Sequence, residues 1–200
     1  MRIISSLYND KKMTNRTLEI YLFAIPAQTG AAGGANLGTQ AITLECSGIN
    51  QKTLPRILSV IFHETAHILE TKHFACLLEE WVKNIDKKTE IKKTWVYQKI
   101  KDVMIILNEI ITSSLLPEGY LSEIISKEKN VKKSIRNYFK DSFNSAVKPL
   151  PKKYRTLKNL RYYSAYHLYP FIKKYISQGR ALDEAYIQKT YQLFREFEGL

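Results

Sequence analysis

The pentapeptide His63-Glu64-Thr65-Ala66-His67 constrains the fold of this chain more than any other segment. It continues the apolar run Leu58-Ser59-Val60-Ile61-Phe62 and is followed by Ile68 and Leu69, so it is predicted to lie on a buried helix. Two histidines four positions apart share one face of a helix, with their Cβ atoms about 5–6 Å apart, and both imidazoles can then reach one metal ion. Glu64 points into the same cleft. The pentapeptide therefore predicts a metal-binding helix inside a folded core.

The composition is that of a globular protein, because 44% of the 200 residues are apolar and 12% are aromatic. A chain of this length and apolar content can bury the core of one domain, which we expect to span residues 1–200. No apolar stretch approaches the length of about 18 residues that a membrane span requires. The first residues also lack the apolar core of a signal peptide, so we expect a cytoplasmic protein if the chain is complete. Cys46 and Cys76 have no CxxC partner, and we expect both to be free, buried thiols.

The chain is basic, with 31 lysines and arginines against 19 acidic residues and a formal net charge of +12. Such a balance can indicate a nucleic-acid surface. Here, however, the lysines of 83–101 and 127–158 alternate with apolar residues at helical spacing. This pattern is typical of the solvated faces of amphipathic helices. We therefore expect no nucleic-acid partner.

The order of predicted elements divides the chain into a short sheet and a long helical part. Segments 17–25 and 40–46 are rich in β-forming residues and are predicted strands, and the glycine-rich segment 29–38 between them is predicted to be a flexible loop. A helix over about 54–72 then carries the pentapeptide, with Thr53 as its N-cap. Further helices are predicted near 75–86, 90–116, 119–144, 155–178 and 181–197, with breaks at Pro117, Pro149 to Pro151 and Gly179. The predicted fold class is α+β, with a small sheet in residues 1–50 and a mainly helical part in 51–200.

Two histidines do not complete a catalytic zinc site, because such sites use three protein ligands and leave a fourth position for water. The first candidate for the third ligand is Glu109, which lies between the apolar runs 103–107 and 110–111. A buried carboxylate is costly unless it is paired, and a zinc ion would pair with it. The other candidates are His73 and the acids Glu79, Glu80 and Glu118.

The order of these residues resembles that of the gluzincins, the thermolysin-like zinc metallopeptidases of the zincin class. The resemblance covers His63, Glu64 and His67 in the first helix and Asn108-Glu109-x-x-Thr112 in a second helix. It implies a zincin-like fold in which His63, His67 and Glu109 bind Zn²⁺. The chain departs from the family because 41 residues separate His67 from Glu109, more than the usual gap. It also departs at Ser113, where thermolysin-like enzymes often carry an aspartate that orients a ligand.

The alternative ligand His73 follows His63 by ten residues, a spacing that resembles that of the metzincins. Those proteins place a glycine three residues after the second histidine so that the chain can turn back to the metal, and here that position is Glu70. If the helix continues through Glu70, His73 lies about 9 Å beyond His67 along the axis and cannot share the ion. We therefore favour Glu109 and keep His73 as the alternative.

The chemistry of such a site follows from charge. Zinc lowers the pKa of its bound water to about 7, and Glu64 is placed to accept the proton as the water attacks a carbonyl. In gluzincins a tyrosine or histidine from the carboxy-terminal half commonly stabilises the oxyanion, and the resemblance implies Tyr163 and His167 for this role, four positions apart on one predicted helix. An extended peptide is expected to pair with the strand at 40–46 or with the glycine-rich segment before it, where Ala35-Asn36 is loosely similar to the substrate-facing segment of the family.

The function that the resemblance implies is that of a zinc-dependent metallopeptidase acting on peptides or proteins. The alternative is a catalytically inactive zincin-like domain that binds or regulates other molecules, with a basic surface. An inactive domain would be free to lose the general base or a ligand, and this chain keeps His63, Glu64 and His67. The retained residues favour the enzyme.

Overall fold

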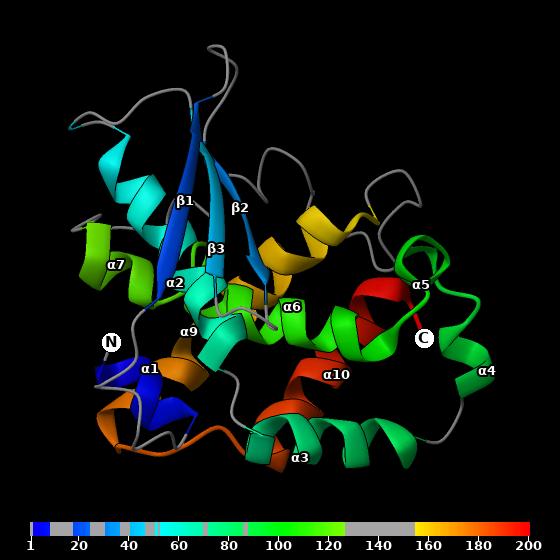
Figure 1. The fold of residues 1–200 in the computed structure, drawn as a ribbon. Helices are drawn as coiled ribbons and strands as arrows, with labels where there is room; N and C mark the ends of the chain where they lie inside the picture. The colour runs from blue at the N-terminus through cyan, green and yellow to red at the C-terminus, as the bar shows by residue number, and fades with distance from the viewer. Residues whose placement is uncertain are drawn as a thin grey trace.

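The computed structural model of the chain describes residues 2–8, 18–24, 31–36, 41–46, 51, 53–69, 72–85, 88–126 and 155–200. It has an α+β fold in which a small three-stranded sheet packs beside a larger helical body (Figure 1). The predicted fold class is confirmed at this level. The part of the predicted helix 119–144 that follows Ser126, and the predicted break at Pro149 to Pro151, lie outside the described residues.

The sheet consists of β1 (Glu19–Ala24), β2 (Ala31–Asn36) and β3 (Ala41–Cys46), in the order β1-β3-β2. The central strand β3 runs parallel to β1 and antiparallel to β2. Ile42, Leu44 and Cys46 alternate inward along β3 and are buried. The strands predicted at 17–25 and 40–46 are confirmed. Since both edges of β3 are already paired, β3 has no free edge for an added peptide.

The glycine-rich segment is a strand rather than the loop that its composition predicts. Glycine is depleted in strands because it adds no side-chain contacts, so a local pattern of this kind indicates a loop. Here the absence of a side chain is what allows β2 to lie against the helix behind it: a Cβ on Gly33 would come within 2.7 Å of Val60 Cγ1 and 3.1 Å of Glu64 Cγ. The packing against this helix therefore overrides the local preference.

The pentapeptide lies on α2 (Leu54–Leu69), as predicted, and the next helix, α3 (Lys72–Lys83), follows closely. The Thr53 carbonyl accepts the first hydrogen bond of α2 from the Ile57 N–H, at 3.0 Å. Pro55 lies in the first turn, where the missing N–H leaves no intrahelical bond unmade. The inner face of α2 buries Ile57, Val60 and Ala66.

One helix predicted over 90–116 is instead three: α4 (Lys88–Ile91), α5 (Trp95–Ile100) and α6 (Val103–Leu115). Two polar side chains start the later helices, because Thr94 Oγ1 accepts from the Tyr97 N–H at 3.2 Å and Asp102 Oδ1 accepts from the Met104 N–H at 2.8 Å. Between them Lys101 adopts a positive φ of 60°, which ends α5. The capping side chains therefore divide an otherwise helical pattern.

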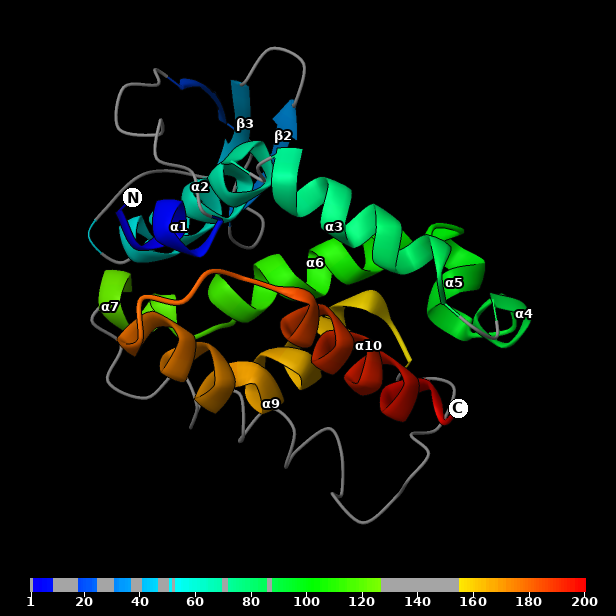
Figure 2. The ribbon, with the colours of Figure 1, turned by 90° about the horizontal axis from the view of Figure 1, so that it is seen from below.

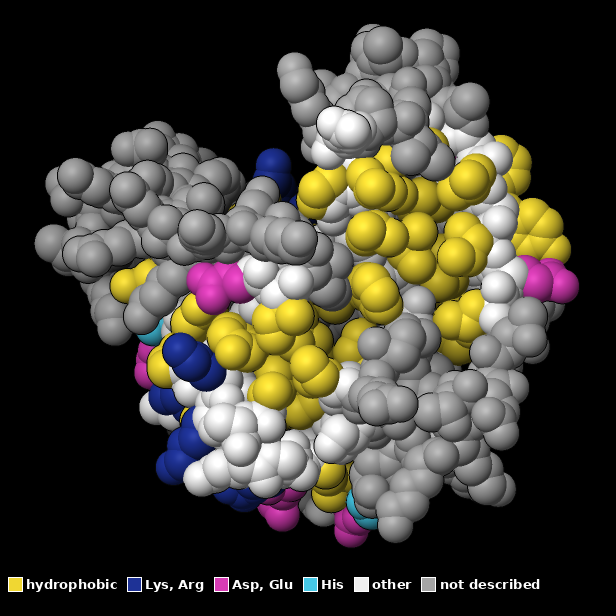
Figure 3. Space-filling model, turned by 90° about the vertical axis from the view of Figure 1, so that its left-hand side faces the viewer, with side chains coloured by type: hydrophobic (Ala, Val, Ile, Leu, Met, Phe, Trp, Pro, Cys, Tyr) yellow, Lys and Arg dark blue, Asp and Glu magenta, His cyan; other side chains and the backbone are white. Residues whose placement is uncertain are grey.

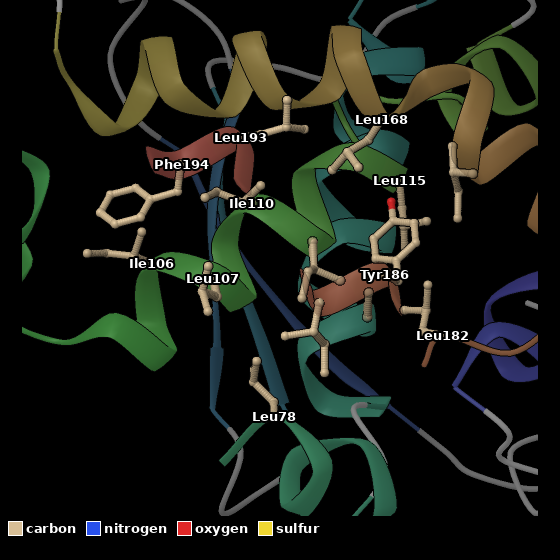
Figure 4. Close-up of a cluster of buried hydrophobic side chains, with 14 of the residues drawn as sticks. Leu78, Ile106, Leu107, Ile110, Leu115, Leu168, Leu182, Tyr186, Leu193 and Phe194 are labelled. Carbon is tan, nitrogen blue, oxygen red and sulfur yellow. The ribbon is translucent and has the colours of Figure 1, made fainter. Parts of the chain in front are cut away.

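The remaining described helices are α1 (Arg2–Leu7), α7 (Leu121–Ser126), α9 (Leu157–Ser177) and α10 (Glu184–Glu198). The last two agree with the predicted ranges 155–178 and 181–197, and Gly179 between them has the expected positive φ, at 61°. The core lies around α6, which passes between α3 on one side and α9 and α10 on the other (Figure 2). Its buried side chains include Leu78, Leu107, Ile110, Leu168 and Phe194 (Figure 4).

The surface combines charged helix faces with an apolar area beside the sheet. Four consecutive large side chains of β1, Ile20 to Phe23, are exposed, and Figure 3 shows apolar side chains gathered on this side of the molecule. Cys46 is buried and Cys76 is exposed, and both are free, so the expectation of two buried thiols is wrong for Cys76. Among the described helices, none is long and apolar enough to cross a membrane.

Candidate metal centre

Helices α2 and α6 bring together the three residues predicted to bind a metal. The Nε2 atoms of His63 and His67 lie 3.2 Å apart on consecutive turns of α2. Glu109 faces them from α6, with Oε1 at 3.4 Å from His67 Nε2 and Oε2 at 3.9 Å from His63 Nε2. One ligand atom from each residue lies within 4.8 Å of the others. In the described part of the chain, no other group of three histidine, cysteine or acidic side chains converges in this way.

Two of the three distances match those of a tetrahedral zinc ion, and the third, between His63 Nε2 and Glu109 Oε2, is longer at 3.9 Å. With ligand bonds of about 2.0–2.1 Å, two ligand atoms on a tetrahedral zinc lie about 3.3 Å apart. The histidine nitrogens are separated by 3.2 Å, and His67 Nε2 and Glu109 Oε1 by 3.4 Å. If these three side chains bound a zinc ion, a fourth position would remain for a water molecule. The residues present therefore suit a zinc ion with one open position.

His63 is held in the form that can bind a metal through Nε2. Its Nδ1 lies 2.7 Å from the carbonyl oxygen of Leu116, and since a carbonyl only accepts, Nδ1 must carry the hydrogen. Burial, helped by the positive charges of His67 and Arg161, holds the pKa of His63 well below its usual range. The ring is therefore neutral at pH 7, and its Nε2 lone pair faces the other two ligands.

The Leu116 carbonyl orients the ring of His63. In thermolysin-like enzymes an aspartate often orients a ligand, and this chain has Ser113 at that position. The carbonyl lies just past the end of α6, where the helix no longer uses it. A backbone carbonyl bonded to the second ring nitrogen is a common way of fixing a histidine ligand. Ser113 contributes differently, because its Oγ accepts a hydrogen bond from Arg161 Nε at 2.7 Å.

Arg161 of α9 is a site residue that the sequence analysis missed. Its Nη2 lies 3.4 Å from Glu118 Oε2 and its Nη1 lies 3.8 Å from Glu109 Oε2. Together with the bond to Ser113, these contacts direct all three guanidinium nitrogens at α6 and the turn after it. Local sequence offers no signal for this role, because Arg161 is one of many basic residues on helical segments and its partners are more than 40 positions away.

The charges around Glu109 keep it ionised. Burial raises the pKa of this carboxyl, but the hydrogen bond from His67 and the positive charges of His67 and Arg161 outweigh burial and hold the pKa well below its usual range. Glu109 is therefore a carboxylate at neutral pH. An ionised carboxylate beside a neutral imidazole is the state in which both can bind a metal.

Glu64 lies beside the three candidate metal ligands and against the edge strand β2. Its side chain is buried, with 8% exposed, and its carboxylate accepts a hydrogen bond from the backbone N–H of Ala35 in β2. Burial raises the pKa of Glu64 above its usual value. Because Gly33 has no Cβ, β2 can approach this side chain closely. The predicted general base, Glu64, is thus held between α2 and β2.

These residues line a pocket of about 540 Å³ between β2, α2, α6 and α9. No described strand pairs with the outer edge of β2, so its backbone groups border the pocket. Two further residues line the pocket: Arg56 in the first turn of α2 and Asn108 of α6. The lining includes Gly33, Ala35, Arg56, His63, Glu64, His67, Asn108, Glu109 and Arg161.

The structure does not bring Tyr163 or His167 to this pocket. The Tyr163 hydroxyl donates to Glu196 Oε2 at 3.3 Å, and the side chain of His167 is exposed and contacts the Tyr163 ring. Both residues follow Arg161 on α9, by about 200° and 240° around the helix axis. Since Arg161 points toward α6, the side chains of Tyr163 and His167 face away from α6. Arg161 is the residue that α9 contributes to the site.

The other candidates for the third ligand also lie elsewhere. His73 is exposed on α3. Glu79 pairs with Lys83 at 2.7 Å, and Glu80 lines a separate groove between α3 and α10. Glu118 is buried but pairs with Arg161 rather than joining the histidines. Of the predicted alternatives, Glu109 alone meets both histidines.

Comparisons of the chain with protein-family models, with curated proteins and with solved structures found no match. The class of site is therefore defined by its own geometry. That geometry comprises three converging side chains of the types that bind zinc, a buried glutamate one position after a ligand, and a pocket bordered by a strand edge.

Proposed function

We propose that this protein is a zinc-dependent metallopeptidase of the zincin class, with gluzincin-type ligands. The observation that carries the proposal is the convergence of His63 and His67 from α2 with Glu109 from α6, beside the buried carboxylate of Glu64. Two histidines and a glutamate are the ligand set of thermolysin-type catalytic zinc sites. When bound there, zinc lowers the pKa of a water to about 7 and polarises a carbonyl oxygen.

The role assigned to Glu64 is that of general base and then general acid. It takes the proton of the attacking water and returns it to the amine that leaves when the peptide bond breaks. Its bond to the Ala35 N–H restricts the carboxylate to one orientation, and burial strengthens its hold on a proton. Both effects suit a group that must transfer the same proton twice.

Arg161 is assigned the stabilisation of the oxyanion, the role that Tyr163 and His167 were expected to perform. Its Nη1 lies 3.8 Å from Glu109 Oε2, and its side chain lines the pocket. A cation in this position stabilises negative charge that develops on the substrate oxygen. The bonds of Arg161 to Ser113 and Glu118 hold the guanidinium in place before any substrate binds.

The substrate class follows from the edge of β2. An unpaired strand edge offers N–H and C=O groups that pair with an extended peptide, and such pairing gives affinity without demanding particular side chains. Gly33 and Gly34 place no side chains between this edge and the pocket. Peptides or unfolded protein segments are the substrates that this arrangement favours.

Zinc content and peptidase activity of the purified protein test the proposal. Wild-type protein is expected to hold one zinc per chain and to cleave members of a quenched fluorescent peptide library. Glu64→Gln should retain the metal and lose at least about a hundredfold in kcat, since general acid–base catalysis contributes about 10²–10⁴. Glu79→Gln, which changes an exposed glutamate on α3, is the matched control and should match wild type.

Two outcomes count against the proposal. Full zinc occupancy in Glu109→Ala, together with loss of zinc in His73→Ala, would contradict the assignment of the third ligand. A zinc-loaded wild-type protein that cleaves no library peptide would contradict the enzyme and favour the inactive binding or regulatory domain.

A further inference from the structure

Arg56 extends the metal pocket along α2. It lies four positions before Val60 and seven before His63, so these side chains share one face of the helix. All three line the pocket. The seven positions correspond to about 10 Å along the helix axis, which an extended peptide spans with about three residues. Arg56 therefore lies within reach of a substrate side chain a few residues from the cleaved bond.

The two arginines of the pocket differ in what they contact. The three guanidinium nitrogens of Arg161 contact Ser113, Glu118 and Glu109. Arg56 makes no hydrogen bond and no ion pair within 4.0 Å with any residue that the structure describes, and its side chain is exposed. A guanidinium offers a planar fork of donors that matches a carboxylate. Arg56 thus keeps its donors available for a ligand.

The carboxylates that face this part of the pocket already have partners. Glu118 pairs with Arg161, Glu109 with His67, and Glu64 with the Ala35 N–H. The positive charge of Arg56 adds to that of Arg161 in opposing the effect of burial on the pKa of Glu118. Arg56 therefore adds a positive charge to this end of the pocket, in a chain whose net charge of +12 attracts anionic molecules.

The packing of β2 on α2 indicates which half of a peptide meets Arg56. Gly33 lies against Val60 and Glu64, and Ala35 binds Glu64, so β2 and α2 run past each other in the same sense. Arg56 then lies toward the start of β2. A peptide added antiparallel to β2, the sense in which β2 already pairs with β3, brings its carboxy-terminal half to that end.

We propose that Arg56 selects substrates that carry a carboxylate in the half of the peptide carboxy-terminal to the cleaved bond, either an acidic side chain or the free carboxy terminus. This inference rests on the proposed function for the position of the bond, but the recognition itself is a binding property. Charge-assisted hydrogen bonds between a guanidinium and a carboxylate are strong enough to change affinity by about tenfold.

Binding to zinc-loaded Glu64→Gln tests this without requiring turnover. The probes are fluorescein-labelled heptapeptides with an uncharged Phe-Leu centre and an amidated end, carrying glutamate in the carboxy-terminal half, glutamate in the amino-terminal half, or lysine in the carboxy-terminal half. A fourth probe is uncharged but keeps its free carboxy terminus. We expect the first or the fourth probe to bind about tenfold more tightly than the lysine probe by fluorescence anisotropy. Which of the two gains affinity distinguishes a side chain from a terminus.

Substitution at Arg56 identifies the residue responsible. In the same Glu64→Gln background, Arg56→Gln should abolish the preference and Arg56→Glu should reverse it in favour of lysine. Lys92→Gln removes an equal charge from an exposed turn outside the pocket and should keep the preference. Equal binding of the glutamate and lysine probes, no binding of any probe, or a preference that survives Arg56→Glu would overturn the inference. A protein that discriminates but never cleaves would lose only the peptidase proposal, and a peptidase that does not discriminate would lose only this one.

Discussion

Gly33 brings the backbone of β2 closer to α2 than any residue with a Cβ allows. An added Cβ would lie 2.7 Å from Val60 Cγ1, 3.1 Å from Glu64 Cγ and 3.3 Å from the Thr43 carbonyl oxygen. Gly34, the next residue, would meet nothing within 4 Å. Two adjacent glycines with the same local sequence context therefore have different structural roles, because the position of Gly33 is crowded by α2 and by the Thr43 carbonyl and that of Gly34 is not.

Replacing Gly33 and Gly34 separately with alanine gives a matched pair of variants. Gly33→Ala is expected to lower the free energy of unfolding by about 1–3 kcal/mol, because the extra methyl overpacks the contact with α2. Gly34→Ala should change it by less than about 0.5 kcal/mol. Urea denaturation followed by circular dichroism measures both. Equal effects of the two substitutions would contradict the close contact between β2 and α2.

The site residues separate into those that local spacing predicts and those that it does not. His63, Glu64 and His67 belong to one helix, so their spacing alone places them on related faces. Glu109 was predicted because a carboxylate among apolar residues needs a partner. The roles of the Leu116 carbonyl and Arg161 could not be predicted in this way, because their contacts with His63 and Glu109 depend on how α2, α6 and α9 pack.

At the scale of elements, capping side chains decide where helices begin. The predicted ranges of α9 and α10 agree with the structure because Thr156 and Asp183 are local start signals and Gly179 is a local stop. The range 90–116 was predicted as one helix because its apolar spacing is continuous. Thr94 and Asp102 interrupt it, and a capping side chain inside a helical pattern can be identified only when its bonds are seen.

Asp183 gives the cap of α10 a dependence on pH. Its Oδ1 accepts from the Tyr186 N–H and from the Tyr175 hydroxyl, and its Oδ2 accepts from Arg180. Burial raises the pKa of Asp183, but these hydrogen bonds outweigh burial and lower it. A group whose pKa is lower in the folded state stabilises the fold above its unfolded pKa, and this stability is lost as the pH falls through the folded pKa.

Asp183→Ala should therefore lower the free energy of unfolding by about 1 kcal/mol at pH 7. The difference from wild type should shrink as the pH falls below about 4, where the unfolded carboxyl takes up its proton. Gln188→Ala, on the exposed face of the same helix, should change stability by less than about 0.5 kcal/mol at either pH. A difference between Asp183→Ala and wild type that does not vary between pH 7 and pH 3 would contradict the role of the charge.

At the scale of the whole molecule, the candidate metal site joins the sheet side of the protein to its helical body. The ligands come from α2, which packs against β2 and β3, and from α6, which packs against α9. The α+β class and the order of the elements from β1 onward could be predicted from composition and periodicity, but the first helix, α1, was not predicted. Periodicity does not predict that α2 meets α6, because 41 residues and three intervening helices separate their candidate ligands. Only the predicted role of Glu109 as third ligand implied this contact.

Zinc should therefore stabilise the folded chain as a unit. An ion that binds only the folded state adds about 2.7 kcal/mol at a free concentration 100 times Kd, which raises Tm by about 5–10 °C for a chain of this size. Differential scanning fluorimetry with and without zinc is expected to show this rise in wild type and in His73→Ala. Glu109→Ala should show little or none. A rise of equal size in Glu109→Ala would mean that α6 takes no part in binding.

The position of the bound metal tests the proposed ligands directly. Crystals of the zinc-loaded protein measured on both sides of the zinc absorption edge should give one strong anomalous peak, about 2.0–2.2 Å from His63 Nε2, His67 Nε2 and a Glu109 carboxylate oxygen. The fourth position should hold a water within hydrogen-bond distance of the Glu64 carboxylate. A peak at His73, or no peak between α2 and α6 under conditions of excess zinc, would contradict the assignment of His63, His67 and Glu109 as the zinc ligands.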